Sequence, residues 1–201
     1  MNAGEFGNQI DILEYEESHD GATYEWCAIS RIWAKMEHQT VSGVFTKNGV
    51  TTRTAKFTIH DMPGLTLHHA VALAPPEAGH FAITDINKDT PGFFILTAAF
   101  VEPVLCTMER TRTEKDSNNR PVSIPAKGLR FYGYLLEKYL RQKQEEPMSY
   151  AETRYILVTP KAIDISAGEL VIIGDNSYEM VIPHLFDPYK NEYEILRRAD
   201  N

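Results

Sequence analysis

The feature that most constrains this chain is an internal correspondence between its two halves. Hydrophobic positions of the first half recur in the second half about 98 residues later. The matched pairs, at offsets of 97 to 99, are Trp33 and Phe131, Phe57 and Tyr155, Ile59 and Leu157, Leu65 and Ile163, Leu67 and Ile165, Leu73 and Val171, Phe81 and Tyr178, Ile83 and Met180, Phe94 and Tyr193, and Leu96 and Ile195. Because the offset stays nearly constant across separate segments, we interpret the chain as a tandem duplication. Its joint lies near Glu102–Pro103, which predicts domains at residues 1–103 and 104–201.

The first half has the pattern of a mainly β domain. Segments rich in β-branched and aromatic residues are separated by turn clusters such as 74–79 and 87–92, whose prolines and glycines exclude a continuous helix. The expected strands are 10–16, 26–36, 54–60, 71–73, 81–86 and 93–101. Strands at this spacing are typical of a small sandwich or barrel. We therefore predict two tandem small β-barrel or sandwich domains of similar topology.

The two halves differ between their second and third strands. In the first half, residues 40–50 are rich in glycine and β-branched residues, which indicates a flexible loop or a hairpin turning at Asn48–Gly49. In the second half, residues 135–146 carry four side chains at helical spacing ahead of Pro147. These are Leu136, Tyr139, Leu140 and Lys143. The second domain is thus predicted to contain a short helix.

Charge and hydrophobicity exclude some classes of protein. Residues 1–103 carry 6 Lys and Arg against 13 Asp and Glu, a net charge of −7, and residues 104–201 carry 14 against 15, a net charge of −1. Tight DNA binding requires clustered Lys and Arg, so we do not expect the chain to bind DNA tightly. The longest apolar run, 93–101, is far shorter than the roughly 20 residues of a membrane-spanning helix. The first residues contain no secretory signal.

Residues that could support catalysis or metal binding do not form a recognisable motif. His68 and His69 are adjacent, and in a strand their side chains would point to opposite faces, so one ion would not easily be bound by both. Cys27 and Cys106 lie in different halves without metal-type spacing, which predicts free thiols in a reducing cytoplasm. We expect no enzymatic activity, no catalytic residues, no bound metal and no cofactor.

Alternating aromatic residues are expected in the core. Phe57, Phe81, Tyr155 and Tyr178 resemble a stacking platform for nucleic-acid bases, but they lack interleaved Arg and Lys. Burial inside the two domains is the favoured interpretation.

Several short motifs follow one another in the first half. They are the opening Met1–Gly4, the turn Asp20–Gly21 followed by Trp26, the segment Trp33–Glu37, the strand that runs into Met62–Gly64, the His-Phe-x-Ile-x-x-Ile segment His80–Ile86, and a final hydrophobic strand. In this order, residues 1–103 resemble the bacteriophage head–tail joining family, whose members are also called head closure, stopper or head–tail adaptor proteins. Members of that family usually have one such domain, whereas this chain has a second copy in which Phe131–Gly133 replaces Trp33–Lys35.

The resemblance implies a structural virion protein that is made in the bacterial host cytoplasm and forms a homo-oligomeric ring, a hexamer or a dodecamer, in the phage neck. Its partners would be a portal or adaptor protein on the head side and a tail terminator or tail tube protein on the tail side. Genomic DNA would pass through the ring without specific binding, and no membrane would be involved.

The resemblance also suggests two contact regions. The loop at residues 40–50 occupies the place of a channel-facing loop that helps such proteins to retain packaged DNA. Its hypothesised channel-facing residues are Val41, Gly43, Phe45, Lys47, Asn48 and Gly49. The expected helix of the second domain is a hypothesised subunit or partner contact.

Two alternatives stay open. One is another ring of the same assembly, such as a tail terminator or a different neck or tail ring protein. The other is a monomeric β-barrel binding module, or a small enzyme, with an unknown ligand. The mass of the protein in solution separates a ring from a monomer, and a concave apolar pocket with convergent polar groups would favour the monomer.

Overall fold

A computed structural model describes residues 6–19, 21–39, 53–74, 79–109, 111–115, 120–125, 128–139 and 153–198. Within these residues the chain is mainly β, as the sequence predicts. It forms two compact units: unit 1 is Met1–Glu16 with Trp26–Pro103, and unit 2 is Glu17–Glu25 with Val104–Asn201. No helix in the described part is long and apolar enough to cross a membrane.

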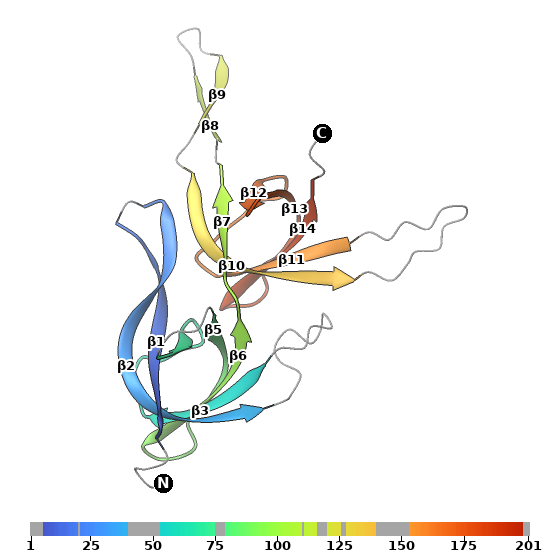
Figure 1. The fold of residues 1–201 in the computed structure, drawn as a ribbon. Coiled ribbons are helices and arrows are strands. Elements are labelled where there is room, and N and C mark those ends of the chain that lie inside the picture. Colours follow the sequence, from blue (N-terminus) through green and yellow to red (C-terminus); the bar gives the residue numbers. More distant parts are fainter. Residues whose placement is uncertain are drawn as a thin grey trace, which may run out of the picture. The chain divides into compact units, whose positions relative to one another are not determined.

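Unit 1 is built from six strands that pair in a closed circuit (Figure 1). They are β1 (Asn8–Glu17), β2 (Thr23–Gln39), β3 (Thr54–His60), β4 (Ala70–Leu73), β5 (His80–Asn87) and β6 (Phe93–Val101). Hydrogen-bonded neighbours follow the order β1-β4-β5-β6-β3-β2, and β2 pairs back with β1. All six strands expected in the first half are present.

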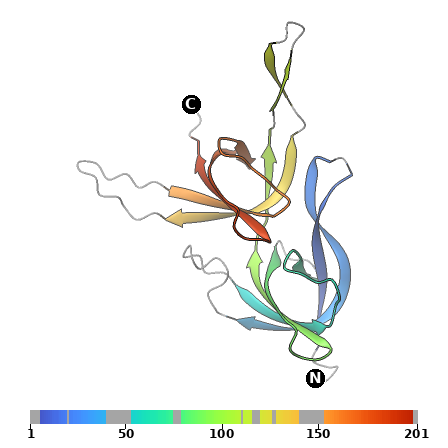
Figure 2. The ribbon, with the colours of Figure 1, turned by 180° about the vertical axis from the view of Figure 1, so that it is seen from behind.

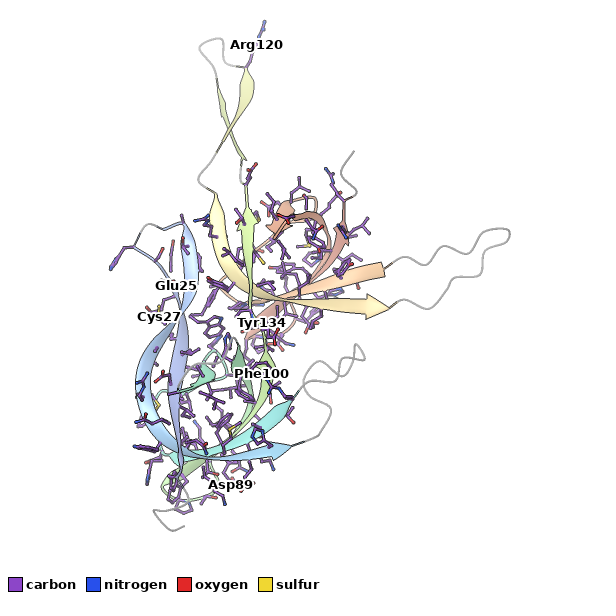
Figure 3. The ribbon with its side chains drawn as sticks, in the orientation of Figure 1. Glu25, Cys27, Asp89, Phe100, Arg120 and Tyr134 are labelled. Atoms are coloured by element: carbon purple, nitrogen blue, oxygen red, sulfur yellow. The ribbon has the colours of Figure 1, made fainter. Side chains whose placement is uncertain are left out.

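The core of unit 1 comes from the inward faces of these strands. Ala55, Phe57 and Ile59 alternate along β3 and are fully buried, as side chains on one face of a strand must be when that face meets the core. Side chains fill the interior of the unit (Figure 3). The rings of Phe57 and Phe81 meet edge to face with centroids 5.2 Å apart, a favoured aromatic geometry.

Unit 2 repeats the circuit with six strands of its own (Figure 2). They are β7 (Val104–Met108), β10 (Leu129–Tyr139), β11 (Thr153–Pro160), β12 (Leu170–Ile173), β13 (Asn176–His184) and β14 (Lys190–Arg197). The order is β10-β11-β14-β13-β12-β7, and β7 pairs back with β10. The strands β8 (Thr111–Lys115) and β9 (Pro121–Pro125), which lie between β7 and β10 in the sequence, form a separate two-stranded sheet.

Residues 17–25 belong to unit 2 although they lie in the first half of the sequence. Thr23 and Tyr24 pair in parallel with Arg130 and Phe131 of β10. The amide of Arg130 donates a hydrogen bond to the carbonyl oxygen of Ala22 at 2.7 Å. The compact units therefore differ from the expected division into 1–103 and 104–201 by this short segment.

The two circuits have the same connectivity, and in one ladder they have the same register. In unit 1, Phe57 lies opposite Leu96 and Ile59 lies opposite Phe94. The residues matched to them by sequence, Tyr155 with Ile195 and Leu157 with Tyr193, are opposite each other in unit 2. Tyr155 and Tyr178 also form an edge-to-face pair at 5.4 Å, like their counterparts Phe57 and Phe81.

One matched pair of the sequence comparison is not structurally equivalent. Met36 faces Phe57 in unit 1, whereas Glu137 faces Tyr155 in unit 2. This register aligns Trp33 with Tyr134 rather than with Phe131. Trp33 is exposed, whereas Phe131 and Tyr134 are both buried. Hydrogen-bond register, and not the spacing along the chain, decides which residues of the two units are structurally equivalent.

The helix expected in the second domain is wrong where the structure describes it. Residues 135–139 continue β10 as a strand, and Leu136 and Tyr139 lie opposite Ile156 and Thr153 of β11. Pairing with β11 gives this segment long-range backbone hydrogen bonds, which override a weak local helical period. Leu140 and Lys143 lie outside the described residues.

Candidate functional site

An aromatic hollow lies at the end of unit 1 where β3 ends and β6 begins. It has a volume of about 790 Å³. Its walls come from the segment before β1, from β2, and from both sides of the β3–β6 pairing. The lining residues are Phe6, Ser30, Ile32, Trp33, His60, Asp61, Met62 and Phe93.

Three aromatic rings in mutual contact form one wall of the hollow. His60 and Phe93 are direct cross-strand partners, and their ring centroids lie 4.9 Å apart. Phe6 stacks on both of them, with its centroid 5.2 Å from His60 and 5.9 Å from Phe93. Cross-strand aromatic pairs stabilise a sheet, so the strand pairing itself holds this wall in place.

Trp33 gives the hollow an exposed apolar surface. Its side chain is 55% exposed, whereas tryptophan side chains are on average largely buried. Asp61 supplies an exposed carboxylate, and this carboxylate has no hydrogen-bond or ion-pair partner among the described residues. The arrangement suits an apolar or aromatic group that carries a positive charge nearby.

A second exposed apolar feature is the loop between β13 and β14 in unit 2. Phe186 is 96% exposed, and Leu185 and Tyr189 beside it are also exposed. The Nζ atom of Lys161 donates hydrogen bonds to the carbonyl oxygens of Leu185 at 3.0 Å and Asp187 at 2.9 Å. The loop is thus held by specific bonds while its aromatic side chain points into solvent.

The carboxylate of Asp187 fixes the other side of this loop. Its Oδ1 atom accepts hydrogen bonds from the amides of Tyr189 at 2.8 Å and Lys190 at 3.2 Å. Such an Asx turn replaces a backbone turn by a side-chain hydrogen bond. Asp187 and Pro188 are residues typical of a turn, but the sequence pattern does not indicate that this turn exposes Phe186.

The contact regions suggested by the family resemblance lie largely outside the described residues. Val41, Gly43, Phe45, Lys47, Asn48 and Gly49 all lie outside the described residues. Leu136 is a half-buried residue of β10. The aromatic hollow and the Phe186 loop were both missed from the sequence, although Trp33 was noted as part of a strand.

Groups able to hold a metal are not found in the described part of the chain, where no three His, Cys, Asp or Glu residues converge. His68 is exposed, and the Nδ1 atom of His69 contacts Thr66 in a local turn. Cys27 and Cys106 are free thiols. Burial raises the pKa of the Cys106 thiol to about 12, so it is not a reactive nucleophile at neutral pH.

Comparisons with protein-family models, with curated proteins and with solved structures yield no match to this chain. The fold and the hollow therefore define only a broad class. The chain is a mainly β protein with two closed six-strand circuits and exposed aromatic surface on each unit.

Proposed function

We propose that this chain is a structural, non-enzymatic protein that assembles as a ring in the neck of a bacteriophage virion, between the portal or adaptor of the head and the tail. The observation that supports this most is the large apolar side chains that both units expose, above all Trp33 and Phe186. Exposed aromatic residues of this kind mark protein–protein contacts. A ring would cover them between subunits.

The two closed circuits are, in this proposal, two small β-barrels that arose by duplication. The shared connectivity and the shared register of the β3–β6 and β11–β14 ladders support a common origin. Duplication gives each chain two similar modules that have since diverged in their loops. The first module carries the resemblance to head–tail joining proteins.

A neck ring must let DNA through without binding it tightly. The net charge of −7 on residues 1–103 suits a wall that does not attract phosphates. Residues 40–50 would supply the channel-facing loop that retains packaged DNA, as the family resemblance suggests. Partners on either side would be the portal or adaptor and a tail terminator or tail tube protein, and a role as tail terminator is the nearest variant of this proposal.

The test is the assembly state of the purified full chain. Sedimentation and negative-stain class averages, with and without a portal ring, are expected to give six or twelve copies around a central channel. A chain that stays monomeric at every concentration and does not bind a portal ring would contradict the proposal.

A monomeric binding module is the second candidate, and the aromatic hollow favours it. An apolar cavity of this size with His60 and Asp61 at its wall has the character of a ligand site. A monomer whose Trp33 fluorescence responds to a small aromatic cation would support this alternative.

A further inference from the structure

Phe186 has the properties of an anchor for a protein contact. Lys161 and Asp187 hold its loop with four hydrogen bonds, so little conformational freedom would be lost when the side chain is buried. Preorganised aromatic side chains at the centre of an exposed patch dominate the affinity of many interfaces. The loop at the same place in unit 1, residues 88–92, has no aromatic residue, so the anchor is specific to unit 2.

The aromatic hollow of unit 1 has the properties of a receptor for such a side chain. Its volume of about 790 Å³ is ample for a phenylalanine and part of its loop. A phenyl ring prefers to pack against other aromatic rings. The hollow offers such a surface in the contacting rings of Phe6, His60 and Phe93 and in the exposed face of Trp33.

Charges beside the two features are complementary. The ammonium of Lys161, at the base of the Phe186 loop, donates to neutral carbonyl groups, and no carboxylate pairs with it among the described residues. Asp61, at the wall of the hollow, has an exposed carboxylate without a partner in the same part of the chain. Bringing the loop to the hollow would give each of these charges a partner of opposite sign.

We infer that the Phe186 loop of one copy inserts into the aromatic hollow of a second copy of this chain. Every copy carries both an exposed anchor and an unfilled hollow, so the same contact can repeat from one copy to the next. A head-to-tail contact of this type generates a ring when its rotation closes. This inference rests on the proposed ring and identifies the contact that would build it.

Photo-cross-linking of the full chain tests the contact directly. Phe186 is replaced by p-benzoylphenylalanine, and chains of this variant labelled with nitrogen-15 are mixed with unlabelled wild-type chains before irradiation. The expected cross-linked peptides join position 186 of a labelled chain to the segments of an unlabelled chain that contain Trp33, Met62 or Phe93. Cross-links to other segments, or only within one chain, would overturn the inference.

A double-mutant cycle measured by sedimentation provides an independent readout. Phe186→Ala and Trp33→Ala are each expected to weaken self-association by at least about 30-fold. The double variant should be little weaker than either single variant, because all three lack the same contact. Leu196→Ala, which removes another exposed side chain of unit 2, serves as the control and should change association by less than about 3-fold.

The outcomes separate the contact from the proposed function. If the wild-type chain forms a ring and Phe186→Ala forms the same ring, the inferred contact is wrong and the proposed ring stands. A wild-type chain that is monomeric at every concentration overturns both. Because Phe186 and Trp33 are exposed, both variants should fold, and their thermal unfolding curves verify this.

Discussion

Asp11 and His80 are the ionisable side chains that unit 1 buries most deeply among the described residues. Arg31 donates two hydrogen bonds to the Asp11 carboxylate, at 2.7 and 2.9 Å, and this holds the pKa of Asp11 below its usual value. His80 packs against Trp26 with ring centroids 4.9 Å apart. Burial lowers the pKa of His80 to about 4. The two groups therefore respond to acid in different pH ranges.

We predict that the stability of unit 1 falls as the pH is lowered from about 6.5 to about 4. In this range an unfolded chain binds a proton at His80 whereas the folded chain does not, so acid favours unfolding. The free energy of unfolding should fall by up to about 3 kcal/mol. Below this range the carboxylate of Asp11 adds a further loss, since protonation removes its bond with Arg31. Urea unfolding at a series of pH values measures the change.

His80→Gln removes the titrating group and should flatten the pH dependence between about 4 and 6.5. His68→Gln, at an exposed histidine of the same unit, is the matched control and should keep the slope of the wild type. Equal slopes in His80→Gln and the wild type would show that another group is responsible.

At the scale of single elements, the close approach of β5 and β6 limits which residue can occupy position 79. Gly79 stands just before β5, and a side chain there would collide with the carbonyl oxygen of Val101 and lie 2.7 Å from the Cζ atom of Phe100. Val101 is the cross-strand partner of His80, so the β5–β6 ladder sets this distance. A glycine is therefore needed for space at this position.

Gly79→Ala is predicted to lower the free energy of unfolding by about 1–3 kcal/mol, because the opposing atom belongs to the backbone and cannot rotate away. Gly7→Ala is the control, since a Cβ atom there would meet nothing within 4 Å. Its effect should be about 0.5 kcal/mol or less. Urea denaturation of both variants decides the matter, and equal stabilities would contradict the packing argument.

At the scale of the whole molecule, the two units are not simply the two halves of the sequence. Residues 17–25 complete unit 2, where the backbone of Ala22 accepts a hydrogen bond from the amide of Arg130. A fragment that begins at the joint near Pro103 thus lacks part of its own unit. The two units share one strand order, and this segment is an addition to it.

We predict that a fragment of residues 104–201 is less stable than unit 2 in the full chain. The amide of Arg130 loses its acceptor and should exchange with deuterium at least about ten times faster than in the full chain. The amide of Leu157, which lies in the β11–β14 ladder, is the internal control. Equal exchange of Arg130 in both proteins would show that residues 17–25 do not support the unit.

The sequence alone determined that the fold is mainly β and where the six strands of the first half lie. It also determined the correspondence between the first-half residues Phe57, Ile59, Phe94 and Leu96 and their counterparts in the second half. These features depend on the local alternation of apolar and polar residues and on turn residues, both of which can be recognised in the sequence. The core positions predicted for Phe57, Phe81 and Tyr178 are confirmed, whereas Tyr155 is only half-buried.

Only the tertiary structure decided the rest. Residues 135–139 are a strand because β11 pairs with them, and strand register aligns Trp33 with Tyr134 rather than with Phe131. The aromatic hollow gathers Phe6, His60 and Phe93 from three separate segments, and Phe186 is presented by bonds from Lys161, 25 positions away in the sequence. Such features arise from pairings between distant residues, for which local patterns carry no signal.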